Sequence, residues 1–188
     1  MKSTALVLLV ILIALLAWIG LKILSNSSGA SQPAPGDAYL GLRSQMLHAS
    51  RTELGLPATS KPTQPWGVLM DWAIPKGSAT VVAISDGNAS VYLSSGGGFI
   101  GGFAHESVRK AAQSTVAAAN EIQPQMHLTT TYPLPQPGEV TFYALTDSGV
   151  FTVSALEADL KSGHSPLSKL SNAAQEVITQ YRLMQQTK

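Results

Sequence analysis

The feature that most constrains this 188-residue chain is an uninterrupted apolar run close to its N-terminus. No charged residue lies between Ser3 and Leu21, and nearly all of these positions are Ala, Val, Leu or Ile. A helix of this length measures about 28 Å, close to the roughly 30 Å hydrocarbon core of a bilayer. The sequence therefore predicts a transmembrane signal-anchor over residues 1–24, in contact with the lipid bilayer through residues 3–21.

A cleaved secretory signal is the competing interpretation of this run, with residues 28–30 as a small-residue cleavage site. The run is longer than the roughly 7–15 apolar residues of most signals, and Lys22 interrupts the approach to the site, so we favour a retained anchor. Lys2 and the α-amino group precede the span, whereas only Lys22 closely follows it. The positive-inside rule then predicts a single-pass protein of the cell membrane, with its C-terminal domain on the extracytoplasmic side.

Composition narrows the class of protein further. Charged residues make up 12% of the chain and hydrophobic residues 45%, which excludes a disordered chain or a coiled coil. The 12 Lys and Arg balance 11 Asp and Glu, so no net field attracts a nucleic acid. The chain has no Cys, which removes disulfides, thiolate metal sites and thiol nucleophiles. Residues 25–36 are rich in Ser, Gly and Pro and predict a flexible linker, which leaves residues 37–188 for a single globular domain.

Within residues 37–188, hydrophobic residues recur with a helical period in some segments and alternate in others. Spacings of three and four predict helices, and alternation bounded by turn residues predicts strands. The expected helices are 37–54, 105–122 and 166–184, and the expected strands are 66–74, 78–85, 89–94, 139–146 and 150–156. This order predicts an α+β domain in which three helices cover one five-stranded antiparallel sheet.

The order of helix, three strands, helix, two strands and helix resembles the profilin-like group of folds, which includes the roadblock and longin-type modules. The resemblance extends over residues 37–188 and concerns the order of elements. The roadblock order of two strands and then three is reversed in this chain. The resemblance carries no motif, so it implies no functional residue.

A glycine-rich stretch over residues 94–103 joins a predicted strand to a predicted helix. Its spacing matches G-x-G-x-x-G, a pattern whose amide groups bind phosphate at a helix N-terminus. A dinucleotide site is disfavoured, because the preceding strand belongs to a hairpin and no later strand completes a βαβ unit. Two interpretations stay open: glycines that allow positive φ and a close helix approach, or a small-ligand or peptide contact. The candidate ligand-binding residues are Ser94, Ser95, Gly96, Gly98, Gly101, His105 and Arg109.

No other motif points to catalysis or to a cofactor. The four histidines (His48, His105, His127 and His164) lack the paired spacing of a metal site, and no G-x-S-x-G nucleophile motif occurs. The sequence therefore assigns no catalytic residue, no metal ligand and no cofactor, and its charge balance disfavours nucleic acid as a partner.

These observations predict a membrane-tethered, extracytoplasmic protein-interaction or assembly module without catalysis, which binds another protein or a second copy of itself. The last helix and the sheet edges are the expected contact surfaces, because small layered domains associate through open edges and helix faces. A small-ligand sensor or carrier that uses loop 94–103 is the alternative. A hydrolase is a third hypothesis, and it requires that histidines, serines and acids converge in one cleft.

Overall fold

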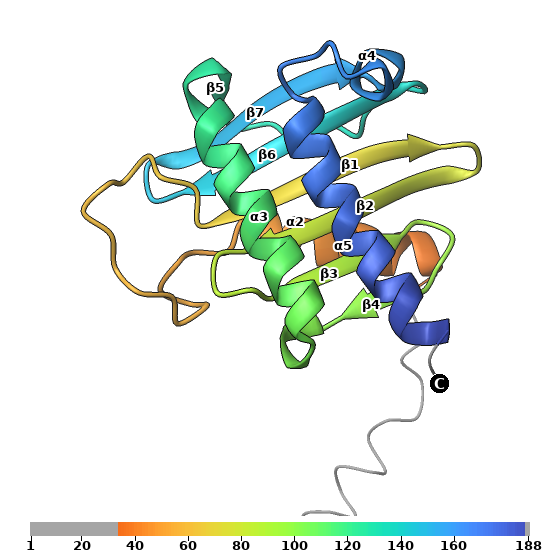
Figure 1. Cartoon of the computed structure of the whole chain (residues 1–188), viewed down its shortest axis with the longest axis horizontal. Coiled ribbons are helices and arrows are strands. Elements are labelled where there is room, and N and C mark those ends of the chain that lie inside the picture. The colour runs from red at the N-terminus through yellow and green to blue at the C-terminus, as the bar shows by residue number, and fades with distance from the viewer. Residues whose placement is uncertain (1–33, 187–188) are drawn as a thin grey trace, which may run out of the picture. The chain divides into compact units, whose positions relative to one another are not determined.

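A seven-stranded antiparallel sheet forms the centre of the structure, a computed structural model that describes residues 34–186. Helices α3 (Glu106–Ile122) and α5 (Ser168–Gln186) lie on one face of the sheet, and α2 (Pro35–Leu47) lies on the other (Figure 1). The strands are β1 (Gly67–Ile74), β2 (Gly77–Ile84), β3 (Ala89–Leu93), β4 (Gly98–Ile100), β5 (His127–Thr129), β6 (Glu139–Thr146) and β7 (Gly149–Leu156), in the spatial order β4-β3-β2-β1-β6-β7-β5. Short elements complete the fold: the 3-10 turns η1 (Gly102–Ala104) and η2 (Gln123–Gln125), and helix α4 (Glu157–Ser162).

The middle strand β1 pairs with β2 and β6, and helices cover it on both faces. Its first five residues are all buried, because neither face of the strand meets solvent. Side chains on the α3 and α5 face form one apolar cluster: Val68, Met70, Val81, Val91, Val108, Ala112, Ala119, Leu170, Ala174 and Val177 are among its members. Those on the α2 face form a second: Tyr39, Leu47, Leu56, Trp66, Leu69, Val82, Ile84, Tyr92, Tyr143 and Leu145.

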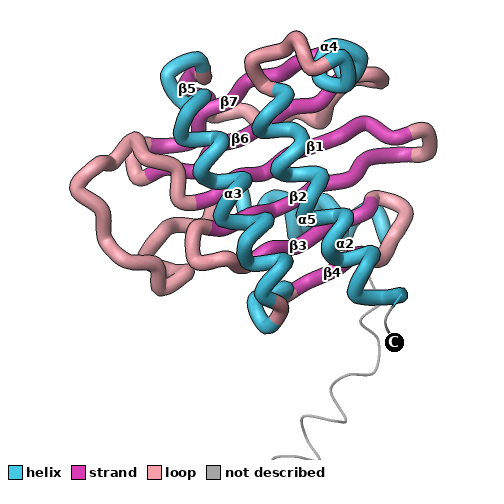
Figure 2. The backbone as a smooth tube through the Cα atoms, viewed as in Figure 1, coloured by secondary structure: helices cyan, strands magenta, loops and turns pink. Residues whose placement is uncertain are grey.

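Helix α2 ends earlier than the predicted helix 37–54, and a separate turn follows it in the connection from residue 48 to residue 66 (Figure 2). His48 ends α2, because its ring Nδ1 lies 2.8 Å from the carbonyl oxygen of Ser44, at the last turn. Ser50 then starts the new turn, since its Oγ accepts from the N–H of Glu53 while the Glu53 carboxylate accepts from the N–H of Ser50. Two local hydrogen-bond patterns thus divide what the hydrophobic spacing presents as one helix.

A buried ion pair attaches α2 to the sheet. The carboxylate of Asp71, in the middle of β1, is 0% exposed and accepts from Arg43 Nε at 2.7 Å and from Arg43 Nη2 at 2.6 Å. Its second oxygen accepts from the hydroxyl of Thr80, the residue directly opposite on β2, at 2.6 Å. The hydroxyl of Tyr39, one turn before Arg43 on α2, lies 3.0 Å from that of Thr80. The negative charge of Asp71 on β1 is therefore neutralised by Arg43 of α2, the helix on the opposite face of the sheet from α3 and α5.

The predicted fold class is corrected in two respects. The five predicted strands are present as β1, β2, β3, β6 and β7, but β4 and β5 extend the sheet to seven strands, so the five-stranded prediction is wrong. Four helices are present among the described residues, because α4 forms where a loop was expected. The two added strands have only three residues each, in a glycine-rich and a proline-containing segment, so neither has a readable alternation.

The predicted transmembrane helix has no counterpart among the described helices. Within residues 34–186, none combines the length and the apolar character that a bilayer crossing requires. The predicted signal-anchor over residues 1–24 lies outside the described residues, as does most of the predicted linker 25–36. The predicted membrane attachment, single-pass topology and extracytoplasmic location are therefore corrected: no described element supports them, and they form no part of the proposed function.

Loss of Arg43 is expected to destabilise the domain strongly. The substitution Arg43→Met keeps an unbranched apolar stem but leaves the buried Asp71 carboxylate without its cation, and such losses cost about 3 kcal/mol or more. Urea denaturation of the full-length chain measures the change in the free energy of unfolding. The double variant Arg43→Met/Asp71→Leu is expected to recover most of this loss, because it removes the unpaired charge.

A matched control and a pH series test this explanation. Arg51→Met removes an ion pair with Asp147, whose side chain is 30% exposed, and is expected to cost about 1 kcal/mol or less. Burial raises the pKa of the Asp71 carboxyl, and Arg43 opposes this effect. Without Arg43 the folded chain binds the Asp71 proton more tightly than the unfolded chain does. The loss in the free energy of unfolding is therefore expected to become smaller as the pH falls from about 7 to about 4. An equal loss at both pH values would contradict the buried-charge explanation.

Candidate functional site

The glycine-rich stretch 94–103 folds into a hairpin turn, the edge strand β4 and the start of η1. The N–H of Gly96 donates to the carbonyl oxygen of Leu93, and the N–H of Leu93 donates to Gly97, which closes the turn between β3 and β4. Gly96 and Gly97 have φ values of 97° and 80°, which favour glycine. The residues that match G-x-G-x-x-G thus build a hairpin and an edge strand, and not the strand-to-helix turn that receives a pyrophosphate.

Two glycines of this stretch allow a close approach of other atoms. A side-chain carbon at Gly98 would overlap the carbonyl oxygen of Val91 on the neighbouring strand. A side-chain carbon at Gly102 would overlap both Val108 of α3 and the hydroxyl of Tyr181 of α5. Glycine at position 102 is therefore required where the chain passes between the start of α3 and the last turns of α5.

A hollow of about 300 Å³ lies beside β4, against the C-terminal end of α5. Phe99 of β4 forms its inner wall, since its ring stacks on Tyr181 with the centroids 4.8 Å apart. The Tyr181 hydroxyl in turn donates to the carbonyl oxygen of Ala89 at 2.6 Å, which fixes α5 to β3. The lining residues are Gly98, Phe99, Ile100, Gly101, Gly102, His105, Tyr181, Met184 and Gln185. The wall is thus aromatic and rigid, while the rim carries polar side chains.

The structure separates the seven predicted ligand-binding residues into two groups. Gly98, Gly101 and His105 line the hollow at one end of β4. The others do not line it: Ser94, Ser95, Gly96 and Arg109. Ser94 lies at the other end of β3, where its Oγ accepts from the N–H of Ser78, beside the β1–β2 turn. The predicted set is therefore not one site.

Arg109 has a structural partner next to the hollow. Its Nη1 donates to the carbonyl oxygen of Phe103 at 2.8 Å, and its guanidinium lies 5.5 Å from the centre of the Phe103 ring. These contacts hold η1 against the first turn of α3, while the Phe103 ring is 50% exposed. The arrangement presents an aromatic ring on the surface and uses the cation to support it.

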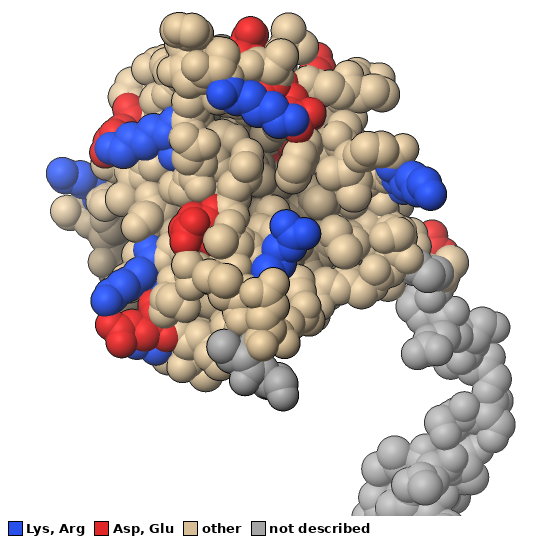
Figure 3. Space-filling view, turned by 45° about the vertical axis from the view of Figure 1, so that its right-hand side comes forward, with Lys and Arg blue, Asp and Glu red and all other residues tan. Residues whose placement is uncertain are grey.

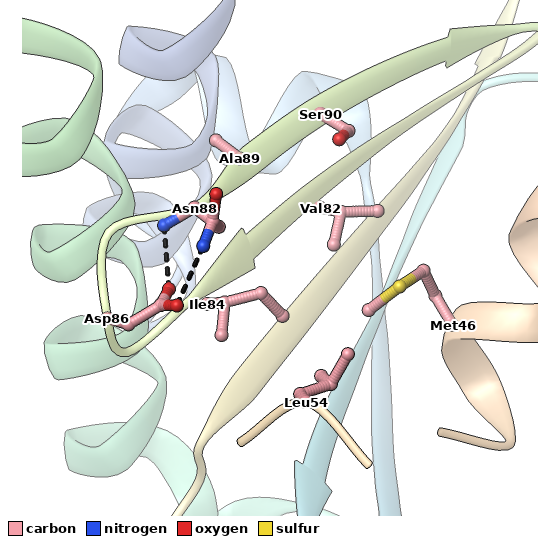
Figure 4. A pocket seen from close by; sticks show the side chains of 8 residues that line it. All are labelled: Met46, Leu54, Val82, Ile84, Asp86, Asn88, Ala89 and Ser90. Atoms are coloured by element: carbon pink, nitrogen blue, oxygen red, sulfur yellow. Dashed lines mark hydrogen bonds between the residues drawn. The ribbon is translucent and has the colours of Figure 1, made fainter. Parts of the chain in front are cut away.

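The opposite face of the sheet carries a smaller apolar pocket of about 140 Å³ (Figure 4). Met46 of α2 and Leu54 of the following turn face Val82 and Ile84 of β2 across it. The polar rim holds Asp86, whose two carboxylate oxygens accept from the main-chain and side-chain nitrogens of Asn88; the other lining residues are Ala89 and Ser90. This pocket can take one apolar group, and the carboxylate at its rim is engaged within its own turn.

The buried cluster around Asp71 is the largest group of polar side chains in the described core, and the sequence analysis did not identify it. Arg43 Nη2 and the hydroxyl of Tyr143 both donate to the carbonyl oxygen of Pro133, at 3.3 and 2.7 Å. Burial raises the pKa of Tyr143 to about 12 and also raises that of Tyr39, so both phenols stay protonated at neutral pH. A general base needs a pKa close to the working pH. The cluster therefore acts as an anchor for α2 and for the segment at Pro133.

No metal site forms within the part of the chain that the structure describes: nowhere do three His, Asp or Glu side chains gather around a common point. The four histidines lie on α2's end, before α3, on β5 and after α4, and do not converge. Comparison of the chain with protein-family models, with curated proteins and with solved structures finds no match. The resemblance to profilin-like folds is therefore unsupported, and the order on which it was based is corrected, because among the described residues four strands precede α3 and three follow it.

The substitution Gly102→Ala is expected to disturb the hollow and to destabilise the domain by about 1–3 kcal/mol, as overpacking does. The added methyl group displaces either Val108 or the Tyr181 hydroxyl, which weakens the bond from Tyr181 to Ala89. Thermal denaturation measures the stability, and the amide NMR shifts of β3 and β4 report the local change.

Gly41→Ala is the matched control, because Gly41 lies within α2 and, apart from its chain neighbours and the nearby helix backbone, nothing lies within 4 Å of the added carbon. This control is expected to be neutral or to stabilise by up to about 1 kcal/mol, as alanine favours helix. Equal effects of the two substitutions would argue against a tight approach of α5 to Gly102.

Proposed function

We propose that the domain is a protein-binding module that contacts its partner through the edges of its sheet. The observation that carries this proposal is the position of the four most exposed large hydrophobic side chains among the described residues. Ile100, 70% exposed, and Phe103, 50% exposed, lie on and just after the edge strand β4. Leu128, 61% exposed, lies on the opposite edge strand β5, and Leu156, 54% exposed, lies at the C-terminal end of β7, past the residues of β7 that pair with β5. Large apolar side chains on open edges are typical of interaction surfaces.

The open edges themselves support the proposal. Within the described residues, β4 pairs only with β3, and β5 pairs only with β7. The faces of the sheet, in contrast, are covered by α3 and α5 on one side and by α2 on the other. Polar backbone groups and apolar side chains therefore meet at the edges, where another polypeptide can satisfy both.

The charge distribution favours an uncharged contact surface. Figure 3 shows one face of the molecule, where positive and negative side chains are scattered and broad uncharged areas separate them. Most ion pairs of the described residues join neighbouring surface groups, such as Lys110 with Glu106 and Lys169 with Glu121. A partner bound by long-range attraction would need a patch of one sign. Apolar and backbone contacts are therefore the basis of the proposed binding.

Site-specific photocrosslinking of the full-length chain in its native cells tests this function. A photoreactive phenylalanine analogue replaces Ile100 or Leu128, and irradiation is expected to give discrete covalent adducts with another protein. Lys76 is the matched control, because it is exposed in the β1–β2 turn, away from both edge strands. Adducts no stronger at the two edge positions than at Lys76 would remove the proposal.

Small-ligand binding is a second candidate function, favoured by the hollow of about 300 Å³ beside β4. Its volume lies at the lower end of the range for ligand sites, roughly 300–1,000 Å³, and its lining combines aromatic walls with polar groups. This candidate predicts that small aromatic fragments shift the amide signals of Gly98, Gly101 and Gly102.

A matched pair of variants tests the hollow. Gln185→Trp places a large ring over its rim and is expected to weaken fragment binding about tenfold or more. Gln186→Trp, one residue further along α5 and outside the lining, is expected to leave binding unchanged. A fragment library that shifts none of the three glycine amides would exclude this candidate.

A further inference from the structure

We infer that the partner is an extended, apolar polypeptide segment that adds as a strand to the outer edge of β4 and places one side chain over the adjoining hollow. This inference rests on the proposed function and specifies the chemical class of its partner. Three features at the same edge carry it: the open backbone of β4, the directions of its side chains and the position of the hollow.

The backbone of β4 specifies a strand as its ligand. Residues of an antiparallel strand direct their N–H and C=O groups alternately to the two sides, and β3 occupies only the inner side of β4. The backbone groups of β4 that face away from β3 are therefore open. Their positions are fixed, because β4 itself pairs in register with Ser90, Val91 and Tyr92 of β3. A segment that joins an existing sheet gains directional hydrogen bonds without ordering that sheet first, which is the basis of recognition by strand addition.

The side chains of β4 show what lies above and below an added strand. Phe99 points to the α3 and α5 face, where it stacks on Tyr181. Ile100 pairs with Ser90, which lines the pocket on the α2 face, so Ile100 points to that opposite face. Alternate residues of an added strand would therefore lie beside the hollow on one face and beside the exposed Ile100 on the other. Apolar side chains suit both positions.

The dimensions favour a peptide segment over a second copy of the chain. Symmetric pairing of β4 with β4 would join two strands of three residues each. Stable protein interfaces use about 20–30 residues on each side, so strand pairing at β4 alone would not hold a dimer together. The hollow of about 300 Å³ lies at the lower end of the range for ligand sites, and its size also suits one large side chain. An extended segment uses both features at once.

The test selects peptides on the full-length chain. A phage library of random decapeptides is selected in parallel against the unchanged chain and against the Ile100→Pro chain, whose edge lacks one N–H group and resists pairing. Leu128→Pro makes the same change on the opposite edge strand and serves as the matched control. Peptides with alternating apolar residues are expected to be enriched on the unchanged chain and on Leu128→Pro, but not on Ile100→Pro.

Backbone methylation of an enriched peptide then separates strand addition from binding by side chains alone. Alternate N-methyl groups remove the hydrogen-bond donors on one edge of the peptide while its side chains are kept, and they are placed first on one edge and then on the other. One of the two methylated peptides is expected to bind about tenfold more weakly or worse, and the other much less so. The unmethylated peptide is expected to slow amide exchange in β4. This comparison stays informative even if Ile100→Pro perturbs the fold.

Two outcomes overturn the inference: equal affinity of all three peptides, or no peptide enriched on the unchanged chain over Ile100→Pro. These two outcomes can be distinguished from a failure of the proposed protein-binding function. A chain that crosslinks to a protein through Ile100 in cells, yet enriches no such peptide, binds its partner in another way. A chain that enriches no such peptide and crosslinks at neither Ile100 nor Leu128 above the Lys76 control lacks the proposed function itself.

Discussion

A carboxylate in the middle of a buried strand has to be neutralised before the strand can be covered on both faces. Asp71 occupies this position on β1, and Arg43 of α2 supplies the cation. The two residues therefore link the helix on one face to the central strand, and the same guanidinium reaches the carbonyl oxygen of Pro133. A buried charge is tolerated only with a well-placed partner, so α2 belongs to the fold and is not an appendage to it.

Once both faces are covered, the edges are the parts of the sheet that remain open. Helices α3 and α5 cover β1, β2 and β3 on one side, and α2 covers the other. The glycines of the 94–103 stretch let the chain turn tightly and let Tyr181 approach the backbone closely. Strand β4 is thereby left at the edge of the sheet. The glycines that suggested a ligand-binding loop thus form an edge of the sheet. The hollow lies where Tyr181 of α5 approaches this edge closely.

Sequence reasoning located the long elements well, because their side chains repeat with a clear period. The strands β1, β2, β3, β6 and β7 and the helix α3 lie within a few residues of their predicted ranges. It failed where local contacts decide the structure. His48 and the turn from Ser50 to Glu53 divide the predicted helix 37–54, and three-residue edge strands such as β4 have too few residues to alternate.

The sequence by itself determined the α+β character, the hairpins and the lack of thiol chemistry, since these follow from periodicity, turn residues and composition. The tertiary structure decided which residues meet. It split Ser94 from His105, placed them at opposite ends of a hairpin, and joined Arg43 to Asp71 across the sheet. These contacts depend on strand order and register, which bring together segments that are far apart along the chain. A local pattern of residues does not specify which distant segment will become its neighbour.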